Sequence, residues 1–197
     1  MKYFIAHLLS GDAKRYHEAL TSELARHFHI EPLSRRVPPH LTFKVPFEAE
    51  SSLLTDVERV IRETVRSRPA PTLFLKGFGH FGYRTIYLNV EKSPEAVALA
   101  RELVLHLVSH VPWLPKAAHD GKKLHASVAR FLERQTFHRL WRLLKNHQPH
   151  FMTNLDNVAI LKQEDGVWKL HTLIPVGEER EHGFSPGKER AEVSLLS

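Results

Sequence analysis

The spacing of apolar residues changes along the chain, and each change marks a predicted element. Alternating apolar and polar positions indicate strands, while apolar residues that recur every three to four positions indicate helices. The first part of the chain predicts the order β-α-β-α-β: a strand over 2–9, a helix from about 12 to 28, a strand over 40–47, a helix from about 53 to 65, and a strand over 71–78.

The same order then repeats. The predicted elements are a strand over 84–90, a helix from about 94 to 107, a strand over 124–131, a helix from about 135 to 144, and a strand over 155–162. A last strand over 167–176 follows the hairpin signal Asp165-Gly166. Residues 178–197 are charged and aperiodic, so we expect a mobile tail.

The two runs are evenly offset. The first helices begin near 12 and 94, and the second near 53 and 135, which is 82 residues in both cases. This predicts an internal duplication within one domain, 1–177, with halves of about 1–80 and 81–177. The alternative is that two such runs resemble each other by chance, as they can in any α/β protein.

Composition narrows the class of protein. Hydrophobic residues at 42% and charged residues at 25% fit a globular chain of 197 residues, and we interpret the N-terminus as a strand rather than a signal peptide. The absence of cysteine excludes disulfides, thiolate zinc sites and a cysteine nucleophile, and it favours the cytoplasm. The formal charge of +6 mildly favours a polyanionic partner, although it could serve solubility alone.

Two short motifs carry the candidate chemistry. Alternate side chains of a strand share a face, so "HLTFKVPF" places His40, Thr42 and Lys44 together. By the same rule "HASVARF" places Ser127 beside His125, at the equivalent strand of the second run. The chain has 15 histidines, so one such triplet could arise by chance at a strand edge. The matched position of the two is what favours function.

These residue types suit reactions of a phosphodiester. A neutral imidazole can take a proton from an attacking hydroxyl while a protonated one donates to the leaving oxygen, because the histidine pKa lies near neutral pH. Hydroxyl groups and a lysine can bind the anionic oxygens between them. The sequence contains no HExxH-like metal motif and no nucleophile-elbow serine.

The stretches "PPHLTFKVPF" and "KLHASVAR" resemble the paired motifs of the 2H phosphoesterase superfamily. More narrowly, they resemble its 2′-5′ RNA ligase-like family, also called RNA 2′,3′-cyclic phosphodiesterases, and "VAILKQEDGVWKLHTLIPV" is similar to that family's last hairpin. The resemblance implies a bilobal α+β (α/β) fold. It would have two pseudo-symmetric β-α-β-α-β halves and mainly antiparallel sheets around a central cleft. It also implies chemistry without a metal or cofactor.

The resemblance carries over to matching positions. It implies that His40 and His125 are the acid–base pair, and that Thr42 and Ser127 bind the phosphate. Lys44 stands where many relatives have arginine, which keeps the charge but loses the bidentate geometry.

Three further residues remain candidates for binding substrate. Arg130 matches a basic residue that often follows the second motif, but strict alternation points it to the far face unless a bulge intervenes. In "GFGHFGY", Phe81 and Tyr83 could stack on a base, or the stretch could be only a glycine turn between strands.

The expected partner is an RNA end or nucleotide with a phosphodiester, bound by a monomer without membrane contact. Two alternatives stay open, a binding module without turnover and a hydrolase of a small non-nucleic cyclic phosphodiester.

Overall fold

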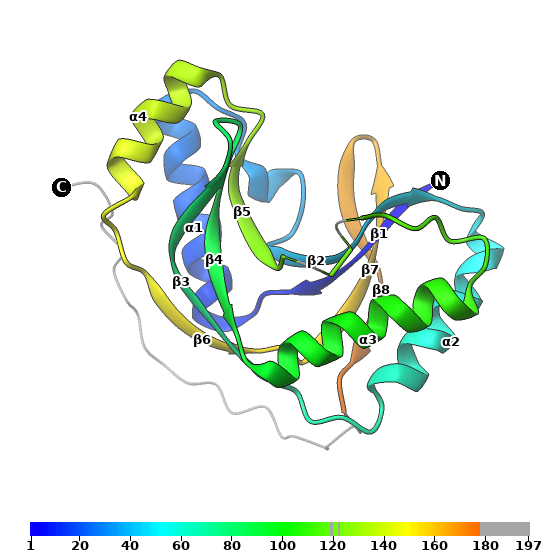
Figure 1. The fold of residues 1–197 in the computed structure, drawn as a ribbon. Coiled ribbons are helices and arrows are strands. Elements are labelled where there is room, and N and C mark those ends of the chain that lie inside the picture. Colours follow the sequence, from blue (N-terminus) through cyan, green and yellow to red (C-terminus); the bar gives the residue numbers. More distant parts are fainter. Residues whose placement is uncertain (119, 122, 178–197) are drawn as a thin grey trace.

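The computed structural model describes residues 1–118, 120, 121 and 123–177. The doubled β-α-β-α-β order is confirmed, and a hairpin closes the domain (Figure 1). The elements are β1 Lys2–Leu8, α1 Gly11–Phe28, η1 Leu33–Arg35, β2 His40–Glu48, η2 Ser51–Leu53, α2 Leu54–Val65, β3 Thr72–Phe81, β4 Thr85–Lys92, α3 Pro94–His110, β5 His125–Arg130, α4 Arg134–Leu144, β6 His150–Asn154, β7 Asn157–Glu164 and β8 Val167–Pro175.

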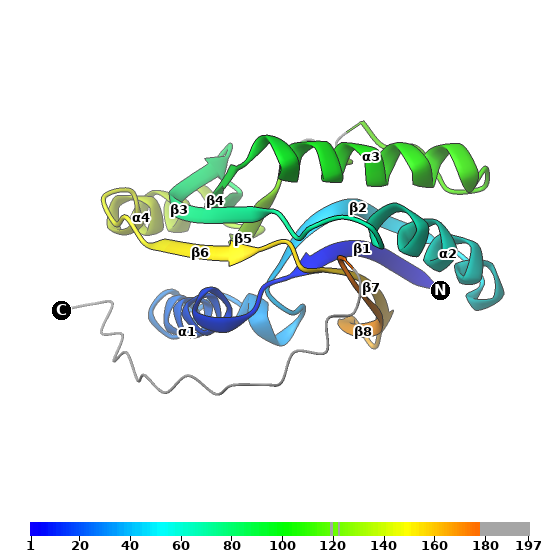
Figure 2. The same ribbon diagram turned by 90° about the horizontal axis from the view of Figure 1, so that it is seen from below.

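Eight strands form two antiparallel sheets of four, in the orders β2-β1-β7-β8 and β5-β4-β3-β6. The helices α2 and α3 contact the first sheet, and α1 and α4 contact the second (Figures 1 and 2). We call these the first and second lobes. The bilobal α+β architecture with antiparallel sheets is therefore confirmed.

The lobes do not coincide with the predicted halves 1–80 and 81–177. Strand β3 belongs to the first run but pairs in the second sheet, while β7 and β8 return to the first sheet. The helices cross over in the same way, because α1 contacts β5 and β6 of the second lobe and α3 contacts β2 of the first. Each lobe thus needs both runs of sequence.

Strand β6, His150–Asn154, was not predicted from the sequence. The third strand of the second run was predicted over 155–162 instead. Those later residues form β7, which pairs with β1 in the other sheet. A five-residue strand with mixed polarity carries too few positions to show a period.

A local sequence signal coincides with one helix cap and one turn of the structure. The hydroxyl of Ser93 accepts a hydrogen bond of 3.1 Å from the amide of Ala96 and caps α3, with Pro94 as its first residue. The predicted turn at Asp165-Gly166 is confirmed, and both residues have positive φ, as this type of hairpin turn requires.

The last two points concern the C-terminal tail and the membrane-spanning potential of the helices. The predicted tail, 178–197, lies outside the described residues. In the part of the chain that the structure describes, no helix has the length and apolarity needed to cross a bilayer.

Candidate active site

The two motif histidines begin two edge strands that lie against each other. His40 opens β2 directly after Pro38 and Pro39, and His125 opens β5. The strands β2 and β5 are in contact, and the amide of Gly121 donates a hydrogen bond of 2.8 Å to the carbonyl of Phe43. The two motifs, which are 85 residues apart in sequence, therefore meet where the lobes join.

Both strands contain a bulge at the same place in the motif. In β2, Thr42 pairs with Ala6 and Lys44 with Ile5, which leaves Phe43 without a partner on β1. In β5, Ser127 pairs with Tyr87 and Ala129 with Ile86, which leaves Val128 without one. An extra residue of this kind reverses the alternation of the side chains that follow it.

The first bulge turns Lys44 away from His40, so the prediction that they share a face is wrong. Lys44 follows the face of Ile5, and it is wholly buried. Its ammonium lies 2.6 Å from Oδ2 of Asp120 and donates to the carbonyl of Pro115 at 2.5 Å. The lysine charge is thus neutralised inside the protein.

The second bulge brings Arg130 to the face of His125. Arg130 pairs with Thr85, while Ser127 pairs with Tyr87, and Thr85 and Tyr87 are two positions apart on β4. The bulge that the sequence argument required for Arg130 is therefore present. Its guanidinium is also close enough to lower the pKa of both histidines.

The two imidazoles are held alike. Nδ1 of His40 lies 2.7 Å from the carbonyl of Pro38, and Nδ1 of His125 lies 2.9 Å from the carbonyl of Lys123. Because a carbonyl only accepts, each Nδ1 carries the proton and donates it. Each neutral ring therefore has a lone pair on Nε2, the nitrogen that can take up a proton from a reactant.

Both histidines are neutral at pH 7 in the free protein. The pKa of His40 is lowered from 6.5 to about 4, chiefly by burial, with smaller contributions from the charges of His17, Arg130 and His125, while the Pro38 hydrogen bond acts against them. Burial also lowers the pKa of His125, with contributions from Arg130 and Lys123. A bound anion between the rings would favour protonation of one of them.

The hydroxyls of Thr42 and Ser127 stand beside the two rings, because each is two residues along the same face. Both side chains are partly exposed. Neither hydroxyl forms a hydrogen bond to another residue in the described part of the chain. They are free to donate to an anionic oxygen.

Aromatic rings flank His125 in the second lobe. The ring of Phe81 lies 4.8 Å from the His125 ring and that of Tyr87 lies 5.1 Å from it, measured between centroids. The ammonium of Lys123 donates to the hydroxyl of Tyr87 at 2.6 Å and lies 4.7 Å from the Phe81 centroid. Gly79 is needed beneath this cluster, since a Cβ there would meet the Tyr87 ring at 2.7 Å.

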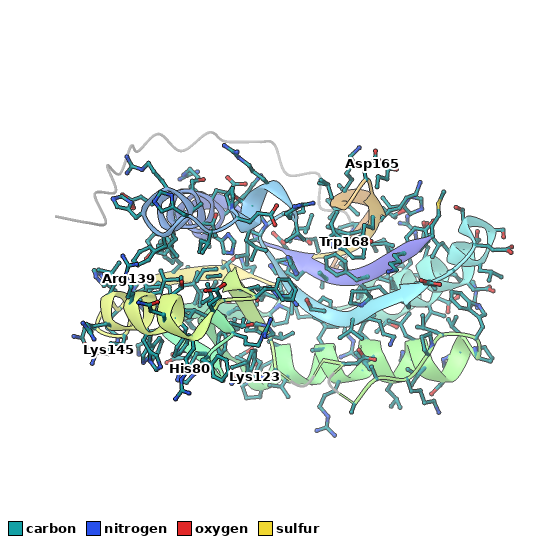
Figure 3. The ribbon with its side chains drawn as sticks, turned by 90° about the horizontal axis from the view of Figure 1, so that it is seen from above. His80, Lys123, Arg139, Lys145, Asp165 and Trp168 are labelled. Carbon is teal, nitrogen blue, oxygen red and sulfur yellow. The ribbon has the colours of Figure 1, made fainter. Side chains whose placement is uncertain are left out.

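A second aromatic group supports His40 in the first lobe. Phe4 lies 5.0 Å from the His40 ring and 4.7 Å from Trp168. Figure 3 shows Trp168 on the first lobe and Lys123 on the second. The half-buried ring of Trp168 packs on the face that carries His40 rather than in the main core.

Of the two aromatic candidates, the structure brings only Phe81 to His125. Tyr83 lies beyond Phe81 in the turn between β3 and β4, is 49% exposed, and has the guanidinium of Arg134 at 5.9 Å. The glycine-rich stretch is not a simple turn, because β3 continues to Phe81.

Sequence reasoning missed Tyr87 and His17. Tyr87 and Asn89 alternate with buried Ile86 and Leu88, so the period of the strand could have revealed their face. His17 gave no signal, since it lies on the buried side of α1. Its Nε2 donates to the carbonyl of Ser127 at 2.7 Å, and burial lowers its pKa.

Curated relatives include proteins named "Putative phosphoesterase" from bacilli. One from Bacillus pumilus is 27% identical over 155 residues, which cover 76% of this chain and 85% of the relative. One from Bacillus cereus is 29% identical over 158 residues, covering 75% and 84%. A Geobacillus protein is 26% identical over 189 residues, covering 92% and 100%.

Solved structures share the fold. The crystal structure of Escherichia coli LigT with 3′-AMP has a TM-score of 0.64 and 16% identity, covering 89% of this chain and 97% of that one. A Thermus thermophilus protein has a TM-score of 0.60 and 18% identity, covering 91% and 100%. The model of the 2′-5′ RNA ligase superfamily matches residues 12–167, which include both histidine motifs. The chain therefore belongs to the 2′-5′ RNA ligase superfamily, a group of 2H phosphoesterases.

Proposed function

We propose that the protein is a metal-independent phosphodiesterase that acts on RNA 2′,3′-cyclic phosphate ends or on 2′-5′ phosphodiester links. The observation that carries this proposal is the convergence of His40 and His125, each with Nδ1 fixed by a backbone carbonyl and Nε2 left to react. Membership of the superfamily supports it, and so does the binding of 3′-AMP by LigT.

The chemistry follows from the two imidazoles. The ring that remains neutral takes a proton from water, or from a ribose hydroxyl in the reverse direction, as the oxygen attacks phosphorus. The other ring gains a proton when the anionic phosphate binds, and it donates that proton to the leaving ribose oxygen as the P–O bond breaks. One ring gains a proton and the other loses one, so the two histidines have exchanged protonation states at the end of the reaction.

The remaining residues of the site would bind the phosphate. Thr42 and Ser127 can each donate a hydrogen bond to a non-bridging oxygen, and Arg130 supplies the positive charge that Lys44 does not. The site is therefore asymmetric, because the residue of β2 that matches Arg130 is Val45.

The test compares His40→Ala and His125→Ala with wild type on a panel of substrates. The panel contains 2′,3′-cyclic nucleotides, short RNAs with cyclic ends, 2′-5′ dinucleotides and a non-nucleic cyclic phosphodiester. We expect each variant to lose about 10²–10⁴-fold in kcat while its unfolding curve stays near that of wild type. The matched control is His138→Ala, an exposed histidine on α4.

Wild-type turnover by either variant would remove the assignment of the histidines. Binding of the panel by the wild-type protein without turnover of any member would instead identify a binding module. Turnover of the non-nucleic diester alone would exclude RNA ends as the substrate.

A further inference from the structure

Phe131, the residue directly after β5, has a conformation and an exposure that folding alone does not favour. Its φ is +57°, in the left-handed region where a residue with a Cβ is strained and where glycine or asparagine is preferred. Its ring is 74% exposed, the highest value among the large hydrophobic side chains that are described. Neither the backbone nor the core therefore explains a phenylalanine at this position, and such outliers often mark a functional constraint.

Arg130 lies against the Phe131 ring, and a second exposed aromatic ring with arginines lies in the neighbouring turn. The guanidinium of Arg130 lies 5.0 Å from the Phe131 centroid, and that of Arg134 lies 5.9 Å from the centroid of Tyr83. The amide of Leu132 donates to the carbonyl of Arg84 at 3.1 Å, which holds the β5–α4 turn beside the β3–β4 turn (Figure 1). We call Tyr83, Arg84, Phe131 and Arg134 the arginine–aromatic ridge.

The charges of the ridge are not used within the fold. In the part of the chain that the structure describes, no carboxylate lies within ion-pair distance of Arg84 or Arg134, or of the adjoining Arg130. Many other surface cations do have such partners, for example Arg59 with Glu63 on α2 and Lys76 with Glu91 on the second sheet. The ridge thus combines unneutralised guanidinium groups with exposed rings.

The ridge continues directly from His125. Arg130, next to Phe131, shares the face of His125 and Ser127. Phe81, on the same hairpin as Tyr83, lies against the His125 ring. A chain that is bound with one phosphodiester at the histidines can therefore extend along the two turns.

We propose that the arginine–aromatic ridge is a binding subsite for the nucleotides of a single-stranded RNA that adjoin the reacting phosphodiester. A base would stack on Phe131, since aromatic side chains stack with any base, and the guanidinium groups would bind the neighbouring phosphates. This inference rests on the proposed function and narrows it, because it makes an oligonucleotide, rather than a mononucleotide, the preferred substrate.

The test measures KM for two substrates, a hexaribonucleotide with a 2′,3′-cyclic end and a cyclic mononucleotide. In Phe131→Ala we expect KM for the hexamer to rise about 5- to 140-fold, the range for loss of one stacked base. KM for the mononucleotide should stay unchanged. Phe131→Asn should show the same loss while it unfolds at the same or a higher temperature, since asparagine tolerates the left-handed backbone.

A binding measurement separates the ridge from the catalysis. Fluorescence anisotropy with a labelled hexaribonucleotide that ends in a plain 3′-hydroxyl needs no turnover, and Phe131→Asn should weaken its binding by a similar factor. The matched control is Met152→Ala, which removes an exposed hydrophobic side chain at the opposite edge of the same sheet. In Arg84→Ala and Arg134→Ala the slope of log affinity against log salt should each fall by about 0.7.

The outcomes are distinct. Unchanged hexamer binding by the folded Phe131→Asn variant would overturn the proposal that the ridge binds RNA. An equal rise in KM for the hexamer and the mononucleotide would overturn it as well. If wild type turns over no substrate, the proposed function fails, but the hexamer titration still decides the ridge.

Discussion

Lys44→Met should unfold more easily than wild type by about 3–5 kcal/mol, because it breaks a buried ion pair. The Lys44 and Asp120 side chains are only 1% and 2% exposed, and Nζ lies 2.6 Å from Oδ2. Removal of one partner leaves the other charge buried without compensation, which typically costs this amount. In the variant the amides of Val45 and Ala117 still donate hydrogen bonds to the Asp120 carboxylate. We therefore expect a loss of stability near the lower end of this range.

The same change should also reduce turnover. The carboxylate of Asp120 joins the segment before His125 to β2, and the Gly121–Phe43 hydrogen bond lies beside it. Loss of this attachment would displace the His125 motif relative to His40. A displacement of about 1 Å can cost about 10²-fold in rate, so we expect a fall in kcat toward that value.

The assay combines urea unfolding with steady-state kinetics. Arg59→Met is the matched control, because it breaks an exposed ion pair, and it should cost no more than about 1 kcal/mol and leave kcat unchanged. A Lys44→Met variant that keeps wild-type stability and shows only a raised KM would refute this reasoning. It would instead support the phosphate contact predicted from the sequence.

Two further predictions concern His40 and Arg130. Burial is the main reason why the His40 pKa is lowered from 6.5 to about 4. Between these pH values the unfolded chain binds a proton that the folded chain does not. The free energy of unfolding is therefore highest above pH 6.5 and falls toward pH 4, by at most about 3 kcal/mol. His40→Gln should flatten that part of the curve of unfolding free energy against pH, and a curve parallel to wild type would contradict the burial effect. Arg130→Ala should raise the pKa of both histidines, and thereby shift the acid limb of the kcat/KM profile to higher pH, while Arg130→Lys restores its position. An unmoved acid limb in Arg130→Ala would place the guanidinium outside the site.

Much of the fold could be predicted from the sequence, because strands and helices are encoded by local periods. The two β-α-β-α-β runs and the Asp165-Gly166 turn each depend on a few neighbouring residues. The pairing of strands does not. The sequence could not show that β3 and β7 exchange sheets, because strand partners are chosen by the complementarity of faces that are distant in the chain.

The same division holds for the site. The motifs themselves indicated His40 and His125, and alternation over two residues was enough to place Thr42 and Ser127 beside them. Directly beyond those positions alternation failed at a bulge in each strand, which buried Lys44 and brought Arg130 to the face of His125.

A bulge leaves little mark in the sequence, because it is stabilised by what each side chain meets in the folded protein. Lys44 meets the carboxylate of Asp120, a residue 76 positions away, and this contact exists only once the lobes have joined. The sequence by itself therefore determined which residues could do the chemistry. The tertiary structure decided which positive charge lies beside His125 and which is buried in an ion pair between the lobes.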